Sequence, residues 1–233
     1  MTDSALRELA DDPSSRKRFF KMMGGAGAVS AASVFLAACG DDDKKSTAST
    51  PAADPAAKNP DEDMKGDLKI LNYALTLEFL EADFYKQVIA SGIVKDPKVG
   101  SIAKKFGQTE QEHVDALKAT ITKLGGKPVE APATKFGPTL EKGLMAVLET
   151  AADVENLGAA AYLGAAGGIK NKDVLAAALS IHSVEARHAA ALNQLLGRGF
   201  GGKGGLNGTL PDGAFAKGMD EKSVLAAVKP FLA

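Results

Sequence analysis

The chain has 233 residues, of which 45% are hydrophobic, and its formal net charge is -1. This length fits one or two domains, and the composition is that of a globular protein. A nearly neutral charge without a basic patch rich in aromatic residues argues against a nucleic-acid partner. The single cysteine, Cys39, lies outside the segment expected to fold, which excludes disulfides, cysteine-ligated zinc and thiol catalysis within the domain.

Residues 1–39 have the organisation of a targeting segment. A basic stretch, 14–21, precedes an apolar run, 22–38, that is short for a membrane span. The segment ends in Leu-Ala-Ala-Cys, which resembles a lipoprotein signal and implies lipidation of Cys39. The basic stretch is also similar to a twin-arginine export signal, although Lys17 replaces the second arginine. We therefore expect an extracytoplasmic location in the cell envelope, anchored to the membrane by the lipidated cysteine, with an uncleaved anchor helix as the alternative.

Residues 40–66 are rich in proline, alanine, serine and charge, with almost no large apolar residue. Such a segment cannot bury enough surface to order itself and is predicted to be a flexible linker. Beyond it, apolar residues recur at alternating steps of three and four, a period that predicts α-helix. Four helices are expected, over residues 67–91, 96–124, 139–169 and 171–196.

Short connections join the first helix to the second and the third to the fourth, which makes each pair antiparallel. Residues 125–138 contain three prolines and no helical period. When extended they could reach about 46 Å, comparable to the roughly 42 Å length of the second helix. The segment can therefore cross back along the bundle. The expected fold is all-α, a four-helix bundle with a crossover between the second and third helices.

Each predicted helical stripe is apolar at its ends and polar in the middle. In the second and fourth helices a histidine follows a glutamate by three residues, so both side chains share one helical face. A carboxylate on a buried stripe costs several kcal/mol unless it is paired, neutralised or bound to a cation. No lysine or arginine lies on these stripes to pair with the carboxylates. The polar residues of the four helices lie at the same height along the bundle to within about one helical turn, which predicts that they bind a common cation. The polar residues are Glu78, Glu110, His113, Glu155, Glu185 and His188.

An internal repeat supports this pattern. Residues 77–85 and 154–162 both place a glutamate seven residues before a tyrosine, Tyr85 in the first copy and Tyr162 in the second. Each copy precedes a helix that carries Glu-x-x-His. The two halves therefore look like a duplicated helical hairpin.

Ferritin-like di-iron and di-manganese bundles have the same ligand pattern: one glutamate from each of two helices, and a Glu-x-x-His motif from each of the other two. Residues 67–197 resemble a ferritin-like domain and are also similar to plant desiccation-related proteins. The resemblance implies that all six polar residues bind two metal ions, with Glu110 and Glu185 bridging and Glu78 and Glu155 terminal.

The same resemblance would place Tyr85 and Tyr162 behind the ligands, each orienting one across the bundle, with ordinary core tyrosines as the alternative. Four carboxylates and two neutral imidazoles balance the charge of two divalent cations. Mixed oxygen and nitrogen ligation suits two iron ions, with manganese or zinc as alternatives.

Other polar residues lie near the stripes. Glu149 falls one position off its stripe and is set aside. Glu81 is expected to be a solvated carboxylate at the rim, with an extra ligand as the alternative. For His182 we expect a structural or rim role. In the glycine-rich extension 198–233, a short helix with Asp220 as its N-cap is expected to form a flap over the bundle, with a partner-binding helix as the alternative. The residues expected to cover the bundle are Val224, Leu225, Val228 and Phe231.

The first functional hypothesis is an envelope-anchored oxidoreductase with a di-iron centre that oxidises ferrous iron or removes peroxide, using dioxygen or peroxide as its oxidant. The second is a non-enzymatic envelope protein for stress or desiccation tolerance, with a structural metal or none. A third is oxygen activation on an organic substrate. The segment between the second and third helices is shorter than in cage-forming ferritins, and a lipid-anchored N-terminus fits poorly with a closed shell, so storage is disfavoured. The Cys-x-x-Cys pairs of rubrerythrins are missing, and with them the rubredoxin-like electron-transfer centre. The sequence is also compatible with a homo-oligomer.

Overall fold

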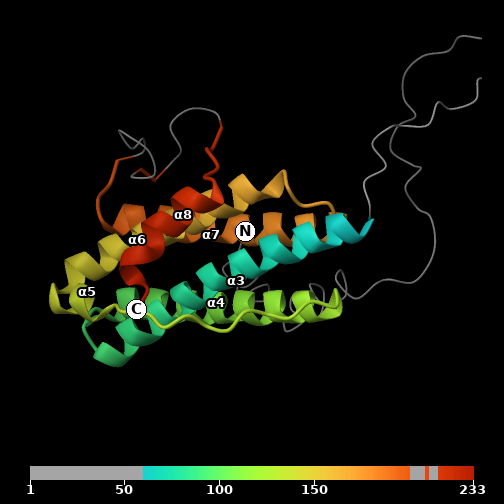
Figure 1. Cartoon of the computed structure of the whole chain (residues 1–233). Helices are drawn as coiled ribbons and strands as arrows, with labels where there is room; N and C mark the ends of the chain where they lie inside the picture. Colours follow the sequence, from blue (N-terminus) through green and yellow to red (C-terminus); the bar gives the residue numbers. More distant parts are fainter. Residues whose placement is uncertain (1–59, 200–207, 210–214) are drawn as a thin grey trace, which may run out of the picture. The chain divides into compact units, whose positions relative to one another are not determined.

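Four long helices dominate the computed structural model, which describes residues 60–199, 208–209 and 215–233 (Figure 1). This part of the chain contains no strand, and none of its helices is long and apolar enough to span a membrane. The all-α prediction is therefore confirmed. The predicted signal 1–39, with Cys39, and residues 40–59 of the predicted linker lie outside the described residues. The helices are α3 (Pro60–Ser91), α4 (Pro97–Lys123), α5 (Gly137–Glu141), α6 (Leu144–Ala166), α7 (Lys172–Leu195) and α8 (Glu221–Val228), followed by the 3-10 helix η1 (Lys229–Phe231).

The long helices pack as two hairpins, α3 with α4 and α6 with α7, and α3 also contacts α6 (Figure 1). The segment between α4 and α6 runs along α3. At one end, Asn72 Nδ2 donates to the carbonyl of Lys127 at 3.3 Å, and Val129 N donates to Asn72 Oδ1 at 2.8 Å. At the other end, Gln87 Nε2 donates to Thr134 Oγ1 at 3.0 Å. This segment is the expected crossover, and it allows α4 and α6 to run parallel.

The first helix begins earlier than predicted, at Pro60 instead of Asp67. Proline suits a helix start because its missing N–H would have no partner there, and three acidic residues in the first turn favour the positive end of the helix dipole. Residues 60–66, which were predicted to belong to the flexible linker, are therefore helical.

The third predicted helix is interrupted. Residues 139–169 were expected to form one helix, but α5 ends at Glu141 and α6 begins at Leu144. Between them Gly143 has a φ of 96°, in the left-handed region that favours glycine. The other two long helices follow the prediction to within a residue at each end, with Asp96 and Asn171 accepting hydrogen bonds as N-caps.

The short helix α8 covers the bundle on the side of α3 and α6. Its side chains Val224 and Val228 are buried, whereas Leu225, which was expected to help cover the bundle, is 37% exposed. Ahead of the helix, the N–H of Met219 donates to the carbonyl of Ala160 on α6 at 2.9 Å. Asp220 caps the helix as predicted, accepting from Ser223 N. The flap is therefore a packed element that seals one side of the domain.

Candidate metal centre

The four long helices bring all six predicted ligands to one buried level. The four carboxylates are 0% exposed, and the two histidines are 8% and 7% exposed. Their oxygen and nitrogen atoms form two groups, within each of which they lie within 4.8 Å of one another. One group consists of Glu78, Glu110, His113 and Glu185, and the other of Glu110, Glu155, Glu185 and His188. Glu110 and Glu185 belong to both groups.

His113 lies at the meeting point of three helices. Its Nδ1 is 2.9 Å from Glu110 Oε2, 3.1 Å from Glu185 Oε1 and 3.2 Å from Glu78 Oε2. One ring nitrogen carries at most one proton and can donate to only one of these oxygens. Three carboxylate oxygens converging on one nitrogen is therefore an arrangement that a shared cation would satisfy better than hydrogen bonds can.

His188 holds the corresponding place in the second group. Its Nδ1 lies 3.1 Å from Glu155 Oε2 and 2.9 Å from Glu110 Oε1, although the second contact lacks hydrogen-bond geometry. The ring of Phe106 stacks on the imidazole, with centroids 3.7 Å apart and planes 18° apart. This stacking fixes the plane of the imidazole and keeps Nδ1 directed at the carboxylates.

Three carboxylate oxygens without hydrogen bonds among the described residues indicate whether the two ligand groups could hold a pair of metal ions. Glu110 Oε1 and both side-chain oxygens of Glu185 are buried and make no hydrogen bond with the described part of the chain. A buried acceptor without a partner costs free energy, and more so when it carries charge. These atoms belong to the two residues that both groups share. The donor set therefore fits two cations held side by side, with Glu110 and Glu185 common to both.

The buried charges raise the proton affinity of the site. Burial, and then repulsion from Glu185, raises the pKa of Glu110 to about 7. Burial likewise raises the pKa of Glu185 well above its usual range, with Glu155 and Glu78 adding to the effect. Burial alone would lower the pKa of His188, but the adjacent carboxylates of Glu110 and Glu155 outweigh it and raise the pKa to about 10. Protons thus offset the repulsion in the metal-free protein, and cations would replace them.

Two tyrosines support the carboxylates across the bundle. The hydroxyl of Tyr85 on α3 donates to Glu155 Oε1 on α6 at 2.5 Å, and that of Tyr162 on α6 donates to Glu78 Oε1 on α3 at 2.5 Å. Burial, followed by the charge of the accepting carboxylate, raises the pKa of both tyrosines well above the usual value. Both hydroxyls therefore keep their protons, and each leaves Oε2 of its glutamate facing the histidine.

One expectation about the surroundings was wrong. Glu81 was expected to be solvated, yet it is only 2% exposed, because α6 and α8 close that side of α3. Burial, and then repulsion from Glu185, raises its pKa well above the usual range. By contrast, Glu149 is exposed, and His182 is partly buried with Nδ1 2.9 Å from the carbonyl of Ala159, outside both groups. A signal that could have indicated the burial of Glu81 is its place in the internal repeat, where it aligns with Gly158.

Comparison with known proteins agrees with this geometry. The family model described as "Ferritin-like domain" matches residues 66–198, more than half of the 233-residue chain. The matched range covers the four long helices from the first turns of α3 onward, and with them every residue of the two groups. A search of curated proteins gave no match. The chain therefore belongs to the ferritin-like domain family.

Proposed function

We propose that the protein binds two iron ions in this centre and uses them to oxidise ferrous iron or to remove peroxide. The observation that carries the proposal is that Glu110 and Glu185, two buried carboxylates with oxygens that make no hydrogen bond with the described residues, belong to both ligand groups. Oxygen and nitrogen donors of this kind suit iron, with manganese and zinc as competitors. Ferrous ions with open coordination positions would supply the electrons that reduce dioxygen or peroxide.

The residues of this chain would contribute in three ways. The two shared carboxylates hold both cations together, and Glu78 and Glu155 each complete one group. The tyrosine hydroxyls fix the orientation of those outer carboxylates. Apolar neighbours exclude water, which strengthens every electrostatic interaction in the centre.

The space beside the centre favours a small oxidant. A cavity of about 10 Å³ lies between α3 and α6 and is lined by Glu81 and apolar side chains. This volume is close to the room that a single water needs. It leaves no room for an organic substrate in this cavity, which weakens the third hypothesis.

The proposed place of action is the outer side of a membrane. The support comes from the sequence alone, in the lipoprotein-like segment that ends at Cys39. Changing Cys39 to alanine should release the protein from the membrane fraction or leave its precursor unprocessed. A mature variant that stays fixed in the membrane would contradict this part of the proposal.

Iron oxidation can be measured directly. Ferrous iron added without oxygen, followed by oxygen, should give a new near-ultraviolet band that saturates at two ions per chain. The double variant Glu110→Ala, Glu185→Ala should abolish the band, and the exposed Glu149→Gln should leave it unchanged. Absence of metal uptake by the wild type would refute the proposal.

A second candidate function rests on how closed the centre is, since no ligand is more than 8% exposed. In this alternative the metal only cross-links the helices of a non-enzymatic stress or desiccation-related protein. Bound zinc with no consumption of oxygen by the iron-loaded protein would favour it. Catalytic turnover of iron or peroxide would exclude it.

A further inference from the structure

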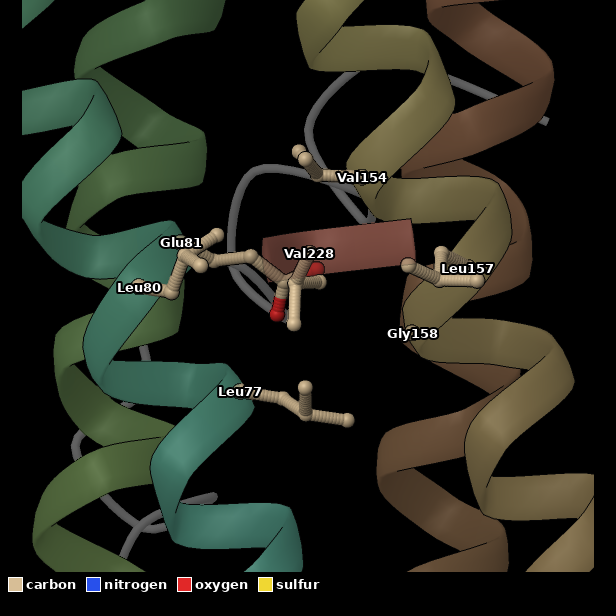
Figure 2. A pocket seen from close by; sticks show the side chains of 7 residues that line it. All are labelled: Leu77, Leu80, Glu81, Val154, Leu157, Gly158 and Val228. Carbon is tan, nitrogen blue, oxygen red and sulfur yellow. The ribbon is translucent and has the colours of Figure 1, made fainter. Parts of the chain in front are cut away.

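Glu81 is a buried carboxylate that the six-residue centre does not use. It lies one helical turn beyond Glu78 on α3 and is only 2% exposed. Figure 2 shows its side chain reaching from α3 into the cavity between α3 and α6. The cavity is lined by Leu77, Leu80, Glu81, Val154, Leu157, Gly158 and Val228.

Gly158 on α6 provides the room for this side chain. A Cβ atom at Gly158 would lie 2.9 Å from Glu81 Oε1 and 3.2 Å from Glu185 Oε2. Both carboxylates therefore approach the same backbone position, one from α3 and the other from α7. Any larger residue would displace at least one of them.

The two copies of the internal repeat differ at the position of Glu81. Residues 77–85 align with 154–162, so Gly158 occupies in the second copy the position that Glu81 occupies in the first. One half supplies a fifth carboxylate, and the other half supplies the space that receives it. A buried carboxylate costs several kcal/mol unless it is paired, protonated or bound to a cation, and a nearby metal ion would remove this cost.

We propose that Glu81 is a seventh protein ligand of the metal centre, which binds from the cavity side an ion held by Glu185. The inference rests on the proposed metal centre and adds to it a ligand that the six-residue pattern does not contain. In the structure Glu81 belongs to neither four-residue group, so its carboxylate must move toward Glu185 when a cation binds. The adjoining cavity gives the side chain room for that movement.

Titration with Co²⁺ tests this without relying on activity. We expect two Co²⁺ per chain for the wild type and for Glu81→Gln, with the dissociation constant of the weaker site raised about tenfold or more in the variant. Loss of a ligand should also intensify the visible d–d bands, because a lower coordination number gives stronger absorption. Gly158→Ala should also raise the dissociation constant and intensify the d–d bands, because its methyl group would displace a carboxylate. Glu149→Gln is the matched control for removing a carboxylate from the surface.

Glu81→Asp separates ligation from charge. It keeps the negative charge but shortens the side chain, so a ligand role requires the Asp variant to resemble the Gln variant. If the Asp variant matches the wild type while the Gln variant is weaker, charge alone acts and the inference is wrong. Unchanged affinity and spectrum in both variants would also overturn it, while leaving the six-residue centre intact. Absence of Co²⁺ uptake by the wild type would instead refute the metal centre itself.

Discussion

The hydroxyl of Tyr162 on α6 donates a 2.5 Å hydrogen bond to Oε1 of Glu78 on α3. The internal repeat contains the reciprocal bond, from Tyr85 on α3 to Glu155 on α6, at the same length. Each half of the duplicated hairpin therefore orients the outer carboxylate of the other half. The two hairpins are linked through the groups that would bind metal, which couples their packing to the occupancy of the site.

Removing one tyrosine hydroxyl should weaken the ion on one side of the centre. Tyr162→Phe frees Glu78, and we expect about a 10- to 100-fold loss of affinity for one Co²⁺, as is usual when the partner of a metal ligand is removed. Tyr73→Phe is the control, because the buried hydroxyl of Tyr73 makes no hydrogen bond with the described residues. Isothermal titration would measure both variants. An equal loss in Tyr73→Phe would show that the cross-bundle bond has no specific role.

The sharing of two carboxylates predicts unequal effects on stoichiometry. Glu78 belongs to one ligand group and Glu110 to both. Glu78→Gln should therefore retain one tightly bound metal ion per chain, whereas Glu110→Gln should lose both. Elemental analysis after dialysis against metal-free buffer would count the ions. Equal counts in the two variants would contradict the shared arrangement.

Local patterns in the sequence were sufficient to predict the long helices and the level of the site. A helix fixes the positions of residues three and four apart, so the stripe through Glu185 and His188 follows from the sequence alone. The start of α3 at Pro60 was missed, although a proline followed by acidic residues is a signal for a helix start. The break at Gly143 could not be predicted, because a glycine within a helical period can be tolerated or can adopt a positive φ.

The environment of Glu81 could not be derived in the same way. Its burial depends on α8, which is distant in the sequence and joined to the bundle by a glycine-rich segment. Helical periodicity predicts which residues share a face, but it does not predict which later segment will cover that face. The alignment of Glu81 with Gly158 in the repeat could have suggested that space was available for a carboxylate, but the space itself is seen only in the structure.

The pKa shifts predict how the stability of the metal-free protein changes with pH. The pKa of Glu110 rises from 4.5 to about 7, so its contribution to folding is present at low pH and is lost between these values. The pKa of His188 rises from 6.5 to about 10, so its contribution is present below pH 6.5 and is lost as the pH rises through 10. The free energy of unfolding contributed by the site should therefore fall as the pH rises from about 5 to about 10.

Metal binding should reverse this trend, because cations displace the protons and bind more tightly at higher pH. Urea unfolding in chelator and in excess Co²⁺, at several pH values, would measure both curves. In the presence of chelator, Glu110→Gln should reduce the change in the free energy of unfolding between pH 4.5 and 7. If the stabilisation by Co²⁺ does not increase with pH, the buried protons are not displaced and this account of the site is wrong.

The packing of the C-terminal segment predicts a role for α8 as the cover of the cavity. A Cβ atom at Gly164 on α6 would lie 2.0 Å from the carbonyl oxygen of Met219, a backbone atom that cannot rotate away. Gly164→Ala should therefore dislodge α8 and expose Val224 and Val228. The expected loss is about 3 kcal/mol or more, since each buried valine contributes about 1.5 kcal/mol or more. The control Gly167→Ala meets no atom within 4 Å and should be close to neutral.

Thermal unfolding and limited proteolysis would detect the displaced segment. All six ligands lie on the long helices, so Gly164→Ala should still bind two Co²⁺ per chain. Because Val228 lines the cavity beside Glu81, its removal should also speed the reaction of the iron-loaded protein with oxygen. A variant that is destabilised but reacts at the wild-type rate would show that α8 stabilises the bundle without controlling access. A variant as stable as Gly167→Ala would show that the contact between Gly164 and Met219 does not hold the segment in place.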